Sequence, residues 1–124
     1  MKAISTTKAP GAIGPYSQAI EVGDFIYTSG QIPIDPTTGT FAEGGIKEQT
    51  RQSLQNIKAI LEEAGSAMEK VIKTTVFLSD MNYFADMNSI YAEFFSEPYP
   101  ARSAVAVKAL PKKALIEIEV VATK

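Results

Sequence analysis

The sequence contains no cysteine, no histidine and no tryptophan. Without cysteine, the chain has no disulfide framework, no thiolate nucleophile and no cysteine-type zinc site. Without histidine, it has neither a Ser-His-Asp triad nor an imidazole metal ligand. Any acid–base chemistry must therefore come from Asp, Glu, Lys or Tyr side chains, from the backbone or from bound water.

An excess of positive charge and long apolar runs are also absent. Twelve Lys and Arg residues stand against fourteen Asp and Glu residues, for a net charge of −2, so the strongly basic footprint of a nucleic-acid-binding protein is missing. No stretch approaches the roughly 18 apolar residues of a membrane span. Met1–Ser5 lacks the apolar run of a signal peptide. We therefore expect a cytoplasmic protein with no membrane partner, and the lack of cysteine is compatible with that compartment.

The residues that are present suit one ordinary globular domain. The 124 residues are 45% hydrophobic and 21% charged, with six Phe and five Tyr available for a core. Pro and Gly are spread along the chain rather than gathered into a linker, and there is no internal repeat. The sequence predicts a single domain over residues 1–124.

Local patterns predict two helices and about five strands. Two apolar segments flank Gly23-Asp24, which suits a type II′ turn, so residues 17–31 predict a β-hairpin. Ile46 to Ala64 carries one apolar stripe at helical spacing, with Gly65 placed as a C-cap. The remaining predicted elements are strands at 71–79, 103–109 and 115–123, and a second helix from Asp80 or Asn82 to about Phe95.

The element order is therefore β-β-α-β-α-β-β. It predicts an α+β fold, a two-layer sandwich with a mixed sheet and both helices on one face. Strand alternation puts Glu117 and Glu119 on the side away from Ile116 and Ile118. The face away from the helices is expected to carry small residues with a few isolated charges. Such a face permits close approach of another subunit and favours a homo-oligomer, although a monomer with a solvated sheet face fits equally well.

Two charged side chains on the predicted strands are candidates for chemistry. Arg102 follows Pro100-Ala101 at the start of a strand, where a fixed guanidinium can hold a carboxylate with two parallel hydrogen bonds. Glu117, in a partly closed cleft, can orient and deprotonate a water molecule. Each residue also has a purely structural interpretation. Arg102 fits a surface or interface salt bridge, and Glu117 fits a solubility charge on an edge strand.

Four polar or flexible positions complete the set of candidates. Tyr16 presents a hydroxyl from the constrained Gly-Pro-Tyr-Ser-Gln turn, and Ser29-Gly30 ends a strand where backbone groups become accessible to a ligand. Asn88 lies on the second predicted helix as a polar contact to a loop. The structural alternatives are a Tyr packed on the core, a β-bulge and an exposed helix residue. No P-loop, Rossmann glycine pattern or metal-ligand spacing is present.

Together these segments resemble the Rid family, the YjgF-like enamine/imine deaminases, and in particular its RidA branch. The likeness covers essentially the whole chain and agrees with the predicted element order. Its most specific mark is Pro-Ala-Arg-Ser with Ile-Glu-Ile-Glu downstream. The matching segments are residues 14–19, 29–33, 100–103, 110–111 and 116–119.

The resemblance implies a chorismate-mutase-like fold and a homotrimer with three clefts between subunits. It also implies the substrates, which are short 2-imino acids and their enamine tautomers released by pyridoxal-phosphate dehydratases. The products are a 2-oxo acid and ammonia. Because such a substrate is already electrophilic, no metal or cofactor is required, and a chain without His or Cys can perform this chemistry.

The resemblance also implies roles for individual residues. By matching position, Arg102 binds the substrate carboxylate and Glu117 positions and activates the attacking water. An arginine suits this task because the carbon that water attacks is next to the carboxylate. The other site positions carried over in this way are Tyr16, Ser29, Gly30, Asn88 and Ala104.

Ala104 is a departure from the family pattern, because many relatives carry Cys there. A contact through the backbone N–H survives this change, whereas thiol-based regulation at this position does not. Two other functions remain as alternatives. One is a non-catalytic module that binds small carboxylates, and the other is an endoribonuclease or translation inhibitor, which the net charge and the lack of histidine disfavour.

Overall fold

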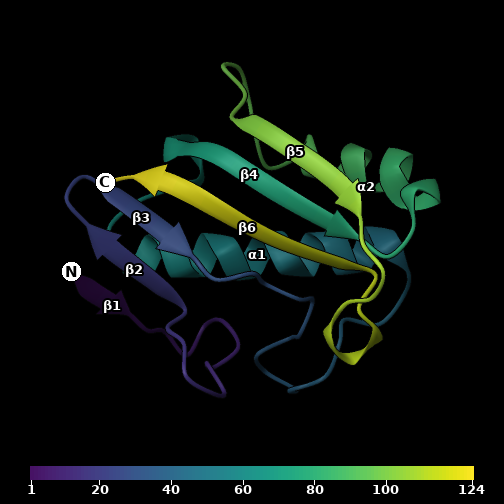
Figure 1. Ribbon diagram of the computed structural model, residues 1–124, viewed down its shortest axis with the longest axis horizontal. Helices are drawn as coiled ribbons and strands as arrows, with labels where there is room; N and C mark the ends of the chain where they lie inside the picture. The colour runs from purple at the N-terminus through teal and green to yellow at the C-terminus, as the bar shows by residue number, and fades with distance from the viewer.

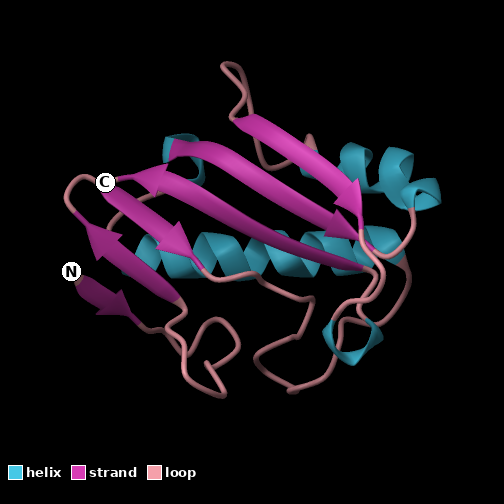
Figure 2. Cartoon of the chain, viewed as in Figure 1, coloured by secondary structure: helices cyan, strands magenta, loops and turns pink.

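The structure is a computed structural model that describes residues 1–124. A mixed β-sheet with two α-helices against one face forms the body of the protein (Figures 1 and 2). The strands are β1 (Lys2–Ile4), β2 (Ala19–Val22), β3 (Phe25–Thr28), β4 (Val71–Leu78), β5 (Ala101–Ala106) and β6 (Ile116–Thr123). The helices are α1 (Ile46–Glu63) and α2 (Phe84–Tyr91), with short 3₁₀ turns at Met68–Lys70, Met81–Tyr83 and Pro111–Lys113.

The six strands lie in the order β1-β2-β3-β6-β4-β5. All neighbouring pairs are antiparallel except β4 and β5, which run parallel. A parallel pair needs a long crossover connection, and the segment that contains α2 provides it. The prediction of an α+β fold with a mixed sheet and both helices on one face is confirmed.

The first hairpin and the first helix are also confirmed. A type II′ turn requires a positive φ only at its first central residue. Gly23 holds that position between β2 and β3 and has φ 56°. Helix α1 ends in a Schellman motif, in which Gly65 has φ 77°. The amides of Gly65 and Ser66 donate to the carbonyls of Glu62 and Leu61, respectively. Neither helix is long and apolar enough to cross a membrane.

One strand and the bounds of two other elements differ from the predictions, and α2 begins at Phe84, after a 3₁₀ turn, rather than at Asp80 or Asn82. Strand β1 was not predicted, because three residues are too few to show an alternation. Helix α2 ends at Tyr91 rather than at Phe95, since the amides of Glu93 and Phe94 donate to carbonyls only three residues back, as in a 3₁₀ turn. Strand β5 covers 101–106 rather than 103–109, and the chain leaves the sheet ahead of Pro111, which has no N–H to donate.

The core lies between the helices and the sheet. In β6, the even-numbered residues are buried and the odd-numbered ones are partly or fully exposed, so the predicted alternation is confirmed. Ile116 and Ile118 pack in the same cluster as Leu54 and Ile57 of α1, and all four side chains have no exposed surface. Burying a side chain of this size stabilises the fold by about 1.5–3 kcal/mol.

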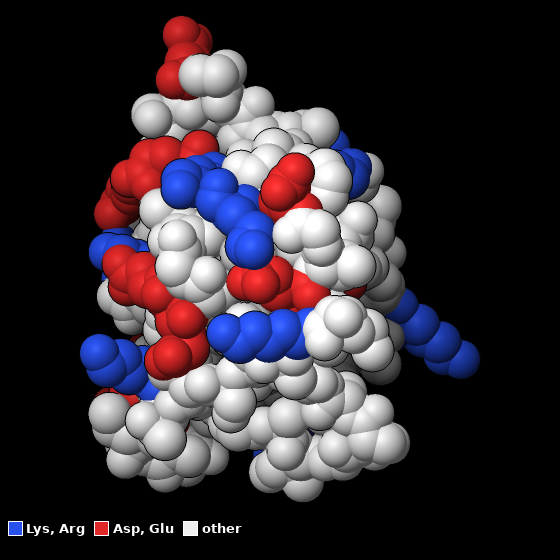
Figure 3. Space-filling view, turned by 90° about the vertical axis from the view of Figure 1, so that its left-hand side faces the viewer, with Lys and Arg blue, Asp and Glu red and all other residues white.

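The other face of the sheet, the open face, is not covered by any element of the chain (Figure 1). It was expected to carry small residues, and this part of the prediction is wrong, because Phe25 and Tyr27 of β3 are 41% and 48% exposed there. Other residues on the open face include Lys73, Phe77, Val105, Glu117 and Glu119. Elsewhere, charges of both signs are interspersed on the side of the molecule drawn in Figure 3.

Candidate active site

The candidate site residues fall into two groups, each beside its own cavity. The first, the Glu117 cavity, has a volume of about 520 Å³. Residues of three loops line it, at 10–16, 29–34 and 111–112, together with Glu117 of β6. The lining residues are Pro10, Gly11, Ile13, Tyr16, Ser29, Gly30, Gln31, Ile32, Ile34, Pro111, Lys112 and Glu117.

Glu117 points into this cavity because of its register in β6. Its neighbours Ile116 and Ile118 are drawn into the core, so strand alternation turns Glu117 to the open face. There it lies opposite Phe77 of β4. Partial burial raises the pKa of Glu117, and the negative charge of Glu119 on the same face raises it further. A carboxylate with a raised pKa is a stronger base for accepting a proton from water.

The segment Ser29–Gln31 fixes the wall beside Glu117. The Ser29 hydroxyl donates to the Ser17 carbonyl at 2.6 Å. Gln31 exchanges backbone hydrogen bonds of 2.7 and 3.2 Å with Ile118 of β6. Between them, the amide of Gly30 makes no hydrogen bond within the chain. A Cβ on Gly30 would lie 2.5 Å from Glu117 Oε1, so the absence of a side chain lets the carboxylate approach the backbone closely.

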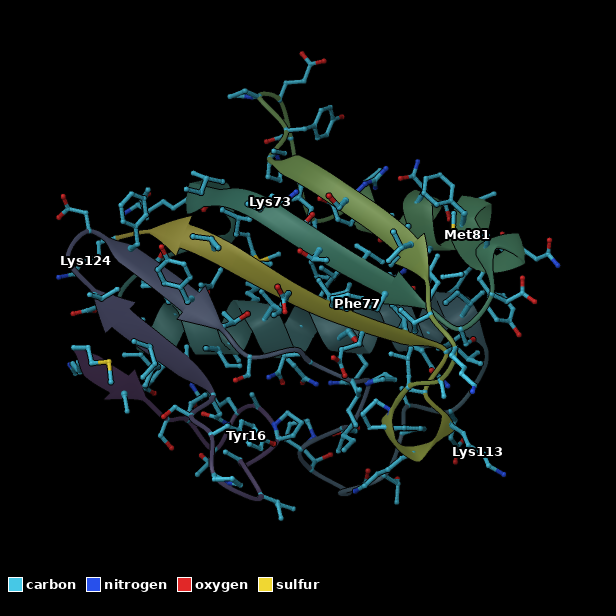
Figure 4. The ribbon with its side chains drawn as sticks, viewed as in Figure 1. Tyr16, Lys73, Phe77, Met81, Lys113 and Lys124 are labelled. Carbon is cyan, nitrogen blue, oxygen red and sulfur yellow. The ribbon has the colours of Figure 1, made fainter.

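Tyr16 lies on the loop between β1 and β2 and is half exposed beside the cavity (Figure 4). Its phenol oxygen accepts from the Ile13 amide at 3.4 Å. Gln18 anchors this loop, because its side chain is buried and makes four hydrogen bonds to backbone groups of Thr6, Ala9 and Pro10. Sequence reasoning did not identify Gln18 as a site residue, although it ends the Gly-Pro-Tyr-Ser-Gln turn.

The second cavity, the Arg102 cavity, has a volume of about 500 Å³ and lies beside α2 and β5. Arg102 Nη1 donates to Asn88 Oδ1 at 2.7 Å. The guanidinium carbon lies 4.7 Å from the centroid of the Tyr91 ring and 5.4 Å from that of Phe84. Arg102 takes part in neither of the two salt bridges of the chain, which join Arg51 to Glu93 and Lys124 to Glu21. The structural alternative of a surface salt bridge within the chain is therefore wrong, whereas an interface salt bridge stays a prediction.

Ala104 belongs to neither cavity lining. It lies opposite Val76 of β4 and packs against the core, on the helix side of the sheet. Its side chain therefore borders the core rather than a ligand space. No group of three or more Asp or Glu side chains is arranged to hold a metal ion.

One chain does not bring the two groups of candidates together. Tyr16, Ser29 and Gly30 gather around Glu117. Asn88 pairs with Arg102, whose register opposite the buried Thr74 places it on the helix side of the sheet. A small ligand that touches both Arg102 and Glu117 therefore needs a cavity made by more than one chain.

Comparisons with known proteins agree with the sequence motifs. The family described as Endoribonuclease L-PSP matches residues 6–124. A RutC family protein of Pyrococcus abyssi is 60% identical over 121 residues, which are 98% of this chain and 95% of the relative. A 2-iminobutanoate/2-iminopropanoate deaminase of Salmonella typhimurium is 51% identical over 126 positions, covering 99% of this chain and 98% of the relative.

A solved structure extends this likeness to the whole fold. The crystal structure of RidA from the Antarctic bacterium Psychrobacter sp. PAMC 21119 is 47% identical, has a TM-score of 0.96 and is covered completely, as is this chain. The chain therefore belongs to the Endoribonuclease L-PSP family, the Rid or YjgF-like group whose motifs it carries.

Proposed function

We propose that this protein hydrolyses reactive 2-imino acids and their enamine tautomers, such as 2-iminobutanoate and 2-iminopropanoate, to 2-oxo acids and ammonia. One observation carries the proposal: Arg102 is half-buried beside a cavity, and its guanidinium has no carboxylate partner in its own chain. A relative with 51% identity is named for this activity.

The proposed reaction uses only groups of the protein chain. Arg102 binds the substrate carboxylate through two N–H groups and so fixes the adjacent imine carbon. Glu117 accepts a proton from water while the water oxygen bonds to that carbon and the C=N electron pair moves to nitrogen. The same carboxyl then returns the proton to nitrogen. Glu117 next takes the hydroxyl proton of the tetrahedral intermediate and passes it to nitrogen, so that the C=O bond of the 2-oxo acid forms, the C–N bond breaks and ammonia leaves.

The proposed site lies between subunits of a homotrimer. Because Arg102 and Glu117 face opposite sides of a single sheet, one chain cannot bring both to the same ligand. In the proposed arrangement, the Arg102 cavity of one chain therefore meets the Glu117 cavity of the next. The exposed Phe25 and Tyr27, two residues apart on the open face of β3, support the assembly, since adjacent exposed apolar side chains mark interaction surfaces. The free amide of Gly30 then serves as a hydrogen-bond donor to the ligand.

The test is competition for an unstable imine. Threonine dehydratase generates 2-iminobutanoate from threonine, and semicarbazide traps whatever has not been hydrolysed. The protein should lower the trapped fraction, and Arg102→Ala should lose this effect. Arg51→Ala is the matched control, because this arginine pairs with Glu93 on the surface. No decrease with correctly folded wild-type protein would refute the proposal.

A second candidate follows from the description of the family as endoribonucleases. RNA cleavage by the purified protein, lost in Glu117→Gln, would favour it over imine hydrolysis. A non-catalytic carboxylate-binding module gives a third pattern, in which a small carboxylate binds with equal affinity to wild type and to Glu117→Gln and no substrate is turned over.

A further inference from the structure

Arg102 is held in place without an acidic partner. Its contacts are the hydrogen bond to Asn88 and the rings of Tyr91 and Phe84, all from α2. A guanidinium has five N–H donors, and only one of them is used within the chain. The nearer ring belongs to Tyr91, with 4.7 Å between its centroid and the guanidinium carbon.

Tyr91 is itself firmly anchored. It is 5% exposed, and its ring packs against Phe95 with centroids 4.5 Å apart. Its hydroxyl forms a 2.8 Å hydrogen bond with that of Thr74, which is fully buried on β4 directly opposite Arg102. Burial raises the pKa of Tyr91, so the hydroxyl stays neutral at neutral pH. The ring beneath the guanidinium is therefore tied to the strand pair that carries the arginine.

We propose that Tyr91 is a positioning residue for carboxylate recognition, because its anchored ring sets the plane of the Arg102 guanidinium. An aromatic ring over one face of a guanidinium leaves its N–H edges free, and a planar carboxylate pairs with such an edge through two parallel hydrogen bonds. The inference rests on the proposed function only in requiring that the ligand carry a carboxylate. It predicts that loss of the ring weakens binding more than chemistry, because Glu117 acts from a different surface.

The experiment measures binding of 2-oxobutanoate by isothermal titration calorimetry, together with imine turnover. Tyr91→Leu should bind this carboxylate about tenfold more weakly, as expected for loss of a desolvated cation–π contact. Its KM should rise by the same factor, while kcat stays within about threefold of wild type. Tyr91→Phe keeps the ring and should bind within about twofold of wild type. Phe94→Leu, a half-buried core aromatic outside the Arg102 cavity, is the matched control and should bind normally.

Three outcomes would overturn the inference: wild-type affinity in folded Tyr91→Leu, an equal loss in Phe94→Leu, or no binding of 2-oxobutanoate by wild type. If Tyr91→Leu does not fold, Tyr91→Met takes its place under the same criteria, because an unbranched side chain fills more of the vacated space. Binding that depends on Tyr91 in a protein without imine turnover would refute the proposed function and leave this inference standing.

Discussion

Arg102 and Glu117 point to opposite faces of one sheet. Arg102 lies opposite Thr74 in the register of β4 and β5, and Glu117 lies opposite Phe77 in the register of β4 and β6. Residues directly opposite each other share a face, and Thr74 is buried under the helices whereas Phe77 is on the open face. The two charged side chains can therefore act on one small substrate only if they come from different chains.

Subunit mixing tests this arrangement. We expect Arg102→Ala and Glu117→Ala to be inactive alone, and a mixed assembly of the two to regain activity. An intact site needs the arginine of one subunit and the glutamate of the next, so every mixed trimer has one intact site in three, and the mixed assemblies should regain about a third of the wild-type activity. Co-expression with two affinity tags and assay of the doubly purified protein would measure this recovery. A double variant with both substitutions is the control and should stay inactive, and a mixed assembly without activity would contradict a shared site.

The position of Glu117 could be predicted from sequence, whereas the surroundings of Arg102 could not. Strand β6 alternates strictly between apolar and other residues, so its outward face follows from the local pattern. Strand β5 has only Arg102, Ser103 and small or apolar residues, and its local pattern does not say which side faces the helices. That choice is made by Asn88 and Tyr91, which meet Arg102 only after the chain has folded.

The role of Gln18, which anchors the loop beside the Glu117 cavity, could not be predicted from the sequence either. Gln18 acts through backbone groups of residues 6–10 that no periodicity links to it. Amide side chains are common on loops, so a buried one has no distinct sequence signal.

Glu119 should contribute to the pH dependence of the reaction through its charge beside Glu117. Glu117 must be ionised to accept a proton, so kcat/KM should fall as the pH drops through its raised pKa. Burial and the charge of Glu119 cause that rise. Glu119→Gln removes the second cause, and we expect the acidic limb of the pH–rate profile to move to lower pH. Glu62→Gln on the exposed surface of α1 should leave the limb in place, and an unmoved limb in Glu119→Gln would contradict the electrostatic coupling.

The same raised pKa predicts how stability responds to pH. The folded state holds the Glu117 proton more tightly than the unfolded state does, so wild type should lose stability as the pH rises between the two pKa values. Glu117→Gln cannot ionise and should be spared this loss. Urea denaturation of both proteins below and above this window measures the difference, and parallel pH profiles would show that Glu117 titrates normally.

Gly30→Ala should impair catalysis without unfolding the chain. The new Cβ would lie 2.5 Å from Glu117 Oε1, so the carboxylate must move, and a displacement of about 1 Å can cost about 100-fold in rate. Gly11→Ala is the matched control, because Gly11 lines the same cavity and a Cβ there meets nothing within 4 Å. The measurement is kcat beside a thermal unfolding curve, and a Gly30→Ala enzyme with normal kcat would show that the close contact is not needed.

Gln18→Leu should release the loop that walls the Glu117 cavity. The substitution leaves the Thr6 amide and the carbonyls of Thr6, Ala9 and Pro10 without their side-chain partner. Because unpaired groups of this kind cost about 1–3 kcal/mol each when they stay dry, and less when water reaches them, we expect the free energy of unfolding to fall by about 2 kcal/mol. Gln55→Leu on the exposed surface of α1 should change the free energy of unfolding by less than about 0.5 kcal/mol.

Trypsin should also cut after the exposed Lys8 faster in Gln18→Leu than in wild type, because local opening governs proteolysis. Equal stability and equal cleavage in the two proteins would mean that the loop is held by β1 alone.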